Sequence, residues 1–192
     1  LRNPLSVATG YLDMAREDGD EEAFDRVDDA LDRMDEIIDD ALATARLGGR
    51  VTDPDDLPLS DIAAEAWATT DAPGATLDVR DDATLSGDER RVKRLLENLF
   101  RNSVDHGSAD ATVTVGATDG GGFYVADDGP GIPEPERDGV FEGGYTTSED
   151  GTGFGLAIVM AAAEAHGWDV SVTESESGGA RFEFRPGTIQ MD

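Results

Sequence analysis

Three glycines at alternate positions, Gly151, Gly153 and Gly155, precede an apolar run that is typical of a helix. A glycine lets backbone N–H groups approach a bound anion because it has no Cβ atom in the way. The first turn of a helix adds unpaired N–H groups and a partial positive charge. The segment therefore predicts a phosphate-binding turn, although glycine-rich turns before helices are common and this pattern alone is not specific.

Two asparagines, Asn98 and Asn102, lie four residues apart in a segment with helical periodicity, so they share one face of the helix. A side-chain carbonyl is a hard oxygen ligand that suits Mg²⁺, an ion that retains most of its waters and bridges nucleotide phosphates. The pair therefore predicts a magnesium-dependent phosphate site. The alternative is a polar, solvent-exposed helix face, and Glu97 beside the pair is consistent with either interpretation.

A carboxylate, Asp127, comes directly after a hydrophobic strand candidate and is followed by Gly129 and Gly131. A carboxylate at a strand end can accept a hydrogen bond from the exocyclic amine of adenine. The glycines leave room for the base beside the backbone, because they carry no side chain. An ordinary Asp-Gly turn is the alternative interpretation of the same residues.

A long loop rich in glycine and proline, residues 130–151, connects this strand end to the glycine turn and contains Phe141, Tyr145 and Thr146. Long loops without secondary structure are uncommon inside compact domains and are usually functional. The loop therefore predicts a lid over bound phosphates. An irregular excursion at the surface is the alternative.

The first 47 residues have the pattern of two helices. Apolar residues recur at intervals of three and four from Leu1 to Ala15, and the series resumes from Phe24 to Ala45 after a turn near Gly19. Two antiparallel helices with narrow apolar stripes cannot close a core alone. We therefore expect residues 1–47 to form a hairpin that pairs with a second copy in a four-helix bundle. Packing of the hairpin on its own chain is the alternative.

A linker is predicted for residues 48–58, which are polar and contain two prolines. After it, helical and strand patterns alternate. Helices are predicted at residues 59–70, 88–106 and 155–166, and strands at residues 76–79, 83–86, 111–117, 122–126, 170–174 and 181–185. The fold class is therefore α+β: a helical hairpin followed by an α/β sandwich domain over residues 59–187, with a short tail at 188–192.

The overall charge is extreme, with 43 acidic residues against 15 basic ones and a formal net charge of −28. Such acidity argues against a nucleic-acid-binding surface, which needs the opposite sign. The acidic residues are spread along the chain, a distribution typical of a halophilic protein that stays soluble in concentrated salt. Binding to a basic partner is the alternative. Cysteine is absent, and there is no run of 18 apolar residues that would span a membrane.

Taken together and in this order, the motifs resemble the catalytic core of sensor histidine kinases, whose ATP-binding domain shares an α/β sandwich with gyrase-type ATPases. The resemblance covers nearly the whole chain and rests on several boxes. Residues 95–104 resemble the N box, 127–132 the G1 box, 140–142 the F box and 151–155 the G2 box; residues 178–182 resemble the closing glycine motif more weakly, and residues 1–5 the end of the H box.

The resemblance implies a role for each matching residue. Asn102 would ligate Mg²⁺, and Asn98 would face the phosphates. Asp127 would bind the adenine amine, and Asn3 falls where the family has a residue that helps to dephosphorylate the partner regulator. The full set of implied ATP-binding residues is Asn98, Asn102, Asp127, Gly129, Gly131, Ile132, Tyr145, Thr146, Gly151, Thr152, Gly153, Phe154, Gly155 and Leu156.

Three departures from the family pattern stand out. The H box begins at its third position, so the phosphoacceptor histidine would lie just upstream of Leu1; the two histidines present, His106 and His166, lack the motif around it. We expect His106 to be a pocket wall or a core residue. Asp105 stands where the family often has a phosphate-contacting lysine or arginine, and Phe154 replaces a commoner leucine.

The resemblance implies a kinase core that transfers the γ-phosphoryl group of ATP to a histidine and then to an aspartate of a response regulator. It also implies a homodimer through residues 1–47 and a cytoplasmic location for this portion, with any membrane or sensor segments upstream of Leu1. The alternatives are a catalytically incomplete ATP-binding scaffold or a regulator phosphatase. A gyrase-like ATPase is disfavoured, because Asn98 stands where those enzymes have a catalytic glutamate.

Overall fold

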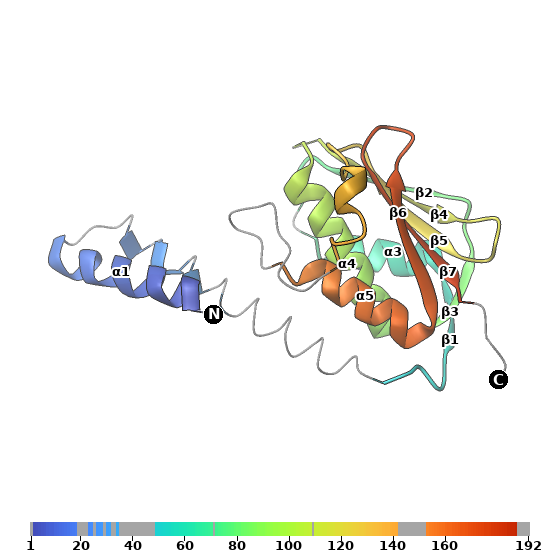
Figure 1. Ribbon diagram of the computed structural model, residues 1–192, viewed down its shortest axis with the longest axis horizontal. Helices are drawn as coiled ribbons and strands as arrows, with labels where there is room; N and C mark the ends of the chain where they lie inside the picture. The colour runs from blue at the N-terminus through green and yellow to red at the C-terminus, as the bar shows by residue number, and fades with distance from the viewer. Residues whose placement is uncertain are drawn as a thin grey trace. The chain divides into compact units, whose positions relative to one another are not determined.

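The computed structural model of the chain describes residues 2–18, 23–24, 26–28, 30–31, 34, 49–70, 72–108, 110–141 and 153–187. It divides into two compact units, residues 1–45 and residues 46–192, which are drawn together in Figure 1 and are treated separately below. The turn predicted near Gly19 and most of the chain between residues 35 and 48 lie outside the described residues.

The first unit contains helix α1 (Arg2–Asp18) and a second segment in which the described residues between 23 and 34 are helical. The guanidinium carbon of Arg26 lies 5.9 Å from the ring centroid of Tyr11, so the second segment packs back on α1. Three alanines of this unit are buried, Ala8, Ala23 and Ala30, whereas larger apolar side chains remain about half exposed: Leu5, Met14, Phe24 and Leu31. The unit therefore leaves an apolar face that its described residues do not cover.

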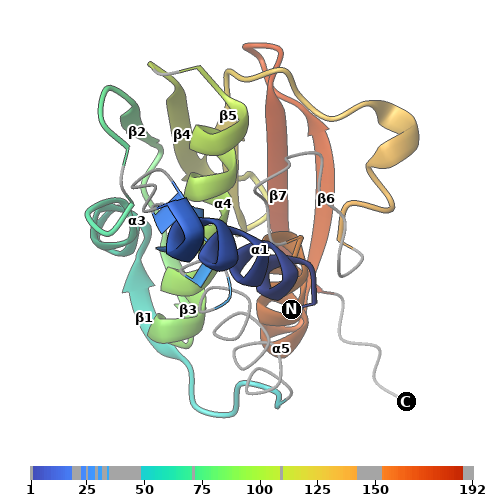
Figure 2. The same ribbon diagram turned by 90° about the vertical axis from the view of Figure 1, so that its left-hand side faces the viewer.

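The second unit has two layers. A five-stranded sheet has the strand order β2-β4-β5-β7-β6, in which β2 and β4 are parallel and the other neighbours are antiparallel. Figure 2 shows the α-helices of this unit lying on one face of the sheet. The strands are β2 (Thr76–Arg80), β4 (Thr112–Ala117), β5 (Phe123–Asp127), β6 (Trp168–Glu174) and β7 (Ala180–Pro186), and the helices are α3 (Leu59–Trp67), α4 (Glu89–His106) and α5 (Gly155–His166). The α+β class is confirmed.

Helix α4 is the centre of the helical layer. Its N-terminus is capped by Asp88, whose carboxylate accepts a hydrogen bond of 3.1 Å from the backbone N–H of Arg91. Its buried side chains recur at intervals of three and four and pack with residues of the sheet: Val92, Leu95, Leu96, Leu99 and Phe100 against Val113, Val115, Val125 and Phe182. The same periodicity fixes the rotation of α4, and therefore the direction in which Asn98 and Asn102 point.

A second, two-stranded sheet pairs β1 (Asp55–Pro58) with β3 (Thr84–Gly87). Strand β1 falls inside the segment for which the sequence predicts a linker, so that prediction missed a strand. Pro54 precedes the strand, Pro58 is its last residue and two of its four residues are acidic, a composition typical of a loop. The strand forms because Leu57 pairs with Leu85 and both side chains are buried.

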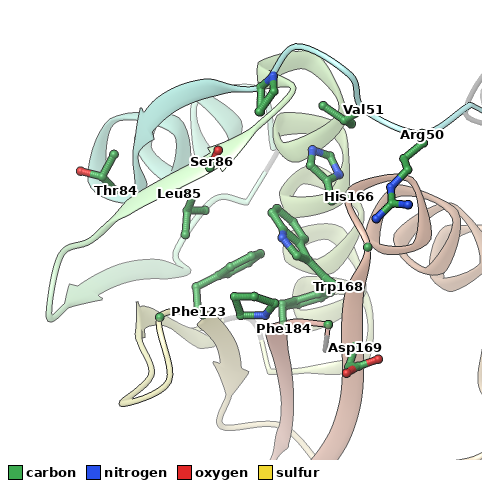
Figure 3. Close-up of a pocket in the computed structure, with 16 residues that line it drawn as sticks. Arg50, Val51, Thr84, Leu85, Ser86, Phe123, His166, Trp168, Asp169 and Phe184 are labelled. Atoms are coloured by element: carbon green, nitrogen blue, oxygen red, sulfur yellow. The ribbon is translucent and has the colours of Figure 1, made fainter. Parts of the chain in front are cut away.

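A cavity of about 750 Å³ lies at one end of the second unit, between the segment that contains Arg50 and the aromatic residues Phe123, Trp168 and Phe184 (Figure 3). None of the described residues predicted to bind the nucleotide lines this cavity. His166 forms part of its wall. The Nδ1 atom of His166 lies 2.7 Å from the carbonyl oxygen of Ala162, and its Nε2 atom accepts a hydrogen bond of 2.9 Å from the N–H of Asp88.

These contacts make stability depend on pH, because burial lowers the pKa of His166 below its ordinary value. Protonated Nε2 could no longer accept the hydrogen bond from Asp88. The unfolded chain takes up the proton first as the pH falls through about 6.5, so the free energy of unfolding should fall below that pH. Urea unfolding of the wild type and His166→Gln between pH 8 and pH 5 measures the effect. The difference in unfolding free energy between the wild type and His166→Gln should shrink as the pH falls. For the exposed control, His106→Gln, the difference from the wild type should show no such change. A pH-independent difference for His166→Gln would contradict this account.

Candidate nucleotide-binding site

The two asparagines predicted to act together lie one turn apart on α4 and face the start of α5. Asn98 is 8% exposed, and its Nδ2 donates a hydrogen bond of 2.8 Å to the carbonyl oxygen of Arg94. This bond uses the amide nitrogen, so the Oδ1 atom is left as the acceptor. A Cβ atom placed on Gly155 would lie 3.3 Å from Oδ1 of Asn98 and 3.4 Å from Oδ1 of Asn102. Two carbonyl oxygens therefore approach the first residue of α5.

The start of α5 has the features of an anion-binding helix end. Phe154 occupies the N-cap position without a side-chain capping bond, and the first turn contains no acidic residue. The earliest N–H groups of a helix have no partner within it and carry a partial positive charge. Gly153 has a φ of +71°, a left-handed conformation that glycine adopts at little cost. Leu156 packs against the core and fixes the helix. Four predicted site residues lie outside the described part of the chain: Tyr145, Thr146, Gly151 and Thr152.

The carboxylate of Asp127 stands at the end of β5 and is held on both oxygens. Its Oδ1 atom accepts 3.0 Å hydrogen bonds from the N–H groups of Gly129 and Ala180. Its Oδ2 atom lies 3.2 Å from the hydroxyl of Ser103, which also lies 3.0 Å from the carbonyl oxygen of Leu99. A carboxylate has about four lone-pair positions. Asp127 can therefore accept one further hydrogen bond from a ligand donor.

The loop after Asp127 is seated against the turn between β6 and β7. Gly131 has a φ of +71°, and a Cβ atom there would lie 2.9 Å from the carbonyl oxygen of Gly178. Ile132 packs against the hydrophobic core, and its carbonyl oxygen accepts a hydrogen bond of 2.9 Å from Nε of Arg137. The sequence predicts room for a base at Gly129 and Gly131. The structure adds a backbone reason for Gly131, because only glycine fits both its conformation and this close approach.

Three residues of the site were given no role from the sequence, although Ser103 falls in the N-box match and Gly179 in the closing glycine motif. Ser103, Ser175 and Gly179 all surround Asp127, through hydrogen bonds or through close packing. Ser103 lies one turn after Leu99 on the same face of α4. A serine in a helix carries no distinct sequence signal of a binding site. Ser175 is 48 residues from Asp127 and Gly179 is 52 residues away, so no local pattern could connect them with it.

Asp105, which departs from the family pattern, and His106 lie in the last turn of α4. Asp105 has an exposed side chain, and partial desolvation nevertheless raises the pKa of its carboxyl group above the ordinary value, against the opposing effect of Arg101. His106 is also exposed, so the expectation that it is a core residue was wrong. The reason is its position after Ser103, the last buried residue of the helix. Asn3 lies in α1, and its side chain is outside the described part of the structure.

The donor set suits a hard cation that is shared with phosphate. Within the described ranges, no three histidine, aspartate or glutamate side chains form a group that could hold a metal ion. The amide oxygens of Asn98 and Asn102 are ligands of the kind that Mg²⁺ accepts while it keeps waters and binds phosphates. The residues present therefore fit a magnesium ion that a nucleotide brings with it.

No described helix is both long and apolar enough to cross a membrane.

Comparison with known proteins gives the same assignment for both parts of the chain. Residues 87–188 match the family of histidine kinase-, DNA gyrase B- and HSP90-like ATPases, and residues 1–50 match the His Kinase A phosphoacceptor domain. The chain is 29% identical over 214 residues to the signal transduction histidine-protein kinase AfsQ2 of Streptomyces coelicolor. That match covers 96% of this chain and 39% of the relative, so the chain spans about two fifths of its length.

Solved structures agree. The Acinetobacter baumannii histidine kinase AdeS superposes with a TM-score of 0.73 at 18% identity, covering 98% of this chain and 97% of that one, which supports the fold. Full-length ShkA in complex with AMPPNP has a TM-score of 0.63 at 30% identity, covering 85% of this chain and 37% of that one. The chain therefore belongs to the histidine kinase-, DNA gyrase B- and HSP90-like ATPase family, and it has the domains of a sensor histidine kinase catalytic core.

Proposed function

We propose that the second unit binds Mg²⁺-ATP between α4, the start of α5 and the end of β5. The observation that carries this proposal is the approach of two asparagine oxygens to Gly155, the first residue of α5. The start of α5 would receive the phosphates, and Asn102 would ligate the magnesium ion. Asp127 would accept the hydrogen bond of the adenine amine. The similarity to ShkA, whose structure contains AMPPNP, supports a nucleotide as the ligand.

The chemistry that fits this site is phosphoryl transfer to a histidine, followed by transfer to an aspartate of a response regulator. The nucleotide supplies the γ-phosphoryl group, and transfer of this kind depends mainly on positioning and charge neutralisation. The similarity to AfsQ2 and the His Kinase A match over residues 1–50 support a histidine acceptor, which we place just upstream of Leu1. Asn3 would serve a separate, opposing activity, the hydrolytic dephosphorylation of the regulator.

Direct hydrolysis of ATP by water is a poorer fit. Glu97 directly precedes Asn98 in the sequence, and it would be the candidate base. Its Oε1 atom accepts a hydrogen bond of 2.8 Å from the hydroxyl of Thr69, at the end of α3. The carboxylate is therefore engaged with α3, whereas Oδ1 of Asn98 faces α5.

The first unit fits a dimerisation hairpin. Leu5, Met14, Phe24 and Leu31 are each about half exposed, and a two-helix unit cannot enclose them. A second copy would cover this face in a four-helix bundle through residues 1–47.

The net charge of −28 fits a protein that works in concentrated salt, where screening reduces repulsion between its carboxylates.

A second candidate function, an ATP-binding scaffold without kinase activity, rests on Asp105. Its carboxyl group occupies the last turn of α4, three residues after Asn102, and would repel a triphosphate when ionised. Arg101, one turn earlier on the same helix, interacts electrostatically with this carboxyl group and offsets part of its charge.

The test is phosphorylation of a chain extended by His-Asp immediately before Leu1. With ATP labelled at the γ-phosphate and Mg²⁺, we expect acid-labile, base-stable label on the added histidine. Asn102→Ala should reduce the rate by at least about 100-fold, because the ion that neutralises the phosphates loses a ligand. The matched control is Asn102→Asp, which keeps an oxygen ligand at the same position and should retain more activity than Asn102→Ala. Acid-stable label, or equal rates in the wild type and Asn102→Ala, would contradict the kinase proposal.

A further inference from the structure

Ser175 is a buried serine at the turn that joins β6 to β7. Ser175 is only 8% exposed, and both its backbone N–H and its carbonyl oxygen make hydrogen bonds that close the turn. The N–H of Ser175 donates a hydrogen bond of 2.8 Å to the carbonyl oxygen of Gly179, and the N–H of Gly178 donates one of 3.0 Å to the carbonyl oxygen of Ser175. The backbone thus accounts for the turn itself, so the serine hydroxyl is available for other contacts.

The hydroxyl connects this turn to Asp127. It donates a hydrogen bond of 2.7 Å to the backbone carbonyl oxygen of Asp127 and accepts one of 2.9 Å from the N–H of Gly179. A second, longer contact of 3.2 Å comes from the N–H of Ser177. A hydroxyl has a single proton to donate. In Ser175 that proton is committed to the main chain of Asp127.

The next residues of the turn contact Asp127 directly. The N–H of Ala180 donates to Oδ1 of Asp127 at 3.0 Å. Gly179 lies so close that a Cβ atom would be 2.2 Å from the carbonyl oxygen of Asp127 and 2.3 Å from its Oδ1 atom. One turn therefore fixes both the main chain and the carboxylate of Asp127. The hydroxyl of Ser175 connects the two, because it contacts the carbonyl oxygen of Asp127 and the N–H of Gly179.

We propose that Ser175 is a positioning residue of the nucleotide site, which aims the Asp127 carboxylate at the exocyclic amine of the base. This role rests on the proposed function. Ser175 does not contact the ligand. It holds the turn so that Ala180 keeps Oδ1 occupied, and Oδ2 is left to face a donor. The class of ligand that this arrangement selects is a purine with an amino group at position six.

Removal of the hydroxyl has a specific consequence. In Ser175→Ala the carbonyl oxygen of Asp127 loses its donor and the N–H of Gly179 loses its acceptor. The turn can then move relative to β5, and the carboxylate loses its fixed direction. The affinity that depends on the amine of the base should therefore fall, whereas the affinity that comes from the phosphates and Asn102 should remain.

The experiment compares two ligands, ATP and purine riboside triphosphate, which lacks the 6-amino group. Equilibrium binding is measured with Mg²⁺ in high salt for the wild type, Ser175→Ala and the control Ser177→Ala, which removes an exposed hydroxyl from the same turn. The wild type and the control should prefer ATP by roughly tenfold or more, as expected for a hydrogen bond to a charged acceptor. In Ser175→Ala the preference should fall to within about threefold of unity.

Thermal unfolding of each variant separates this role from a loss of stability. If Ser175→Ala does not fold, Ser175→Cys carries the same test, because a thiol is nearly isosteric and a weaker donor. A folded Ser175→Ala that keeps the wild-type preference for ATP would overturn the positioning role. A wild-type chain that binds neither triphosphate would contradict the proposed function itself, and the positioning role would fall with it.

Discussion

Asp127→Asn should abolish nucleotide binding and leave the fold intact, with a rise of at least about 100-fold in the dissociation constant for ATP. The amide is isosteric with the carboxylate. Its oxygen can still accept from the N–H groups of Gly129 and Ala180, which hold Oδ1 of Asp127. The amide nitrogen then takes the place of Oδ2 and presents N–H groups to the amine of adenine. Two donors face each other, and the contact becomes repulsive.

The neighbouring residue gives a matched control. Oδ1 of Asp128 accepts a hydrogen bond of 2.9 Å from the N–H of Thr112, and the amide oxygen of Asp128→Asn can accept it equally well. This variant removes the same charge one residue away, so its dissociation constant should stay within about threefold of wild type. Calorimetry on both variants, with circular dichroism to verify folding, makes the comparison. Equal losses in the two variants would mean that charge, and not a hydrogen bond at Asp127, governs binding.

Gly179→Ala should both destabilise the second unit and remove nucleotide binding. The new Cβ atom would lie 2.2 Å from the backbone oxygen of Asp127, and a backbone atom cannot move aside as a flexible side chain can. Overpacking of this kind costs about 1–3 kcal/mol of unfolding free energy. The strand end must shift to relieve the contact, so the carboxylate moves as well. Urea unfolding and ATP binding measure the two consequences separately.

Gly178→Ala is the control for this prediction. Gly178 has a φ of +91°, so a side chain there is strained, but no atom lies within 4 Å of the Cβ position. This variant should lose about 1 kcal/mol of stability and keep its affinity for ATP. The reverse pattern, with binding lost in Gly178→Ala and retained in Gly179→Ala, would show that the turn does not position Asp127 by close packing.

The elements that the sequence predicted well are those with strong local periodicity. The five-residue apolar face of α4 is a local signal, and the structure places α4 and α5 within one or two residues of the prediction. The two asparagines could be assigned to one helix face for the same reason. Their approach to Gly155 could not, because it depends on the packing of α4 against α5.

What the sequence could not show is non-local. Strand β1 forms because Leu57 pairs with Leu85 on β3, although the composition of β1 itself is typical of a loop. Ser175 contributes to the site only because β5 and β7 are neighbours in the sheet. This pairing brings the turn between β6 and β7 into contact with Asp127. The exposure of His106 follows from where the core ends along α4, and the helical period alone does not reveal that point.

The first measurement to make is calorimetric binding of a non-hydrolysable ATP analogue to the wild type and Asn102→Ala, each with and without Mg²⁺. High salt should be used throughout, because it screens the net charge of −28. The account predicts that the wild type binds more tightly when Mg²⁺ is present and that Asn102→Ala loses this gain. No binding to folded wild-type protein, or an equal gain from Mg²⁺ in both proteins, would contradict the nucleotide site assigned to α4 and α5.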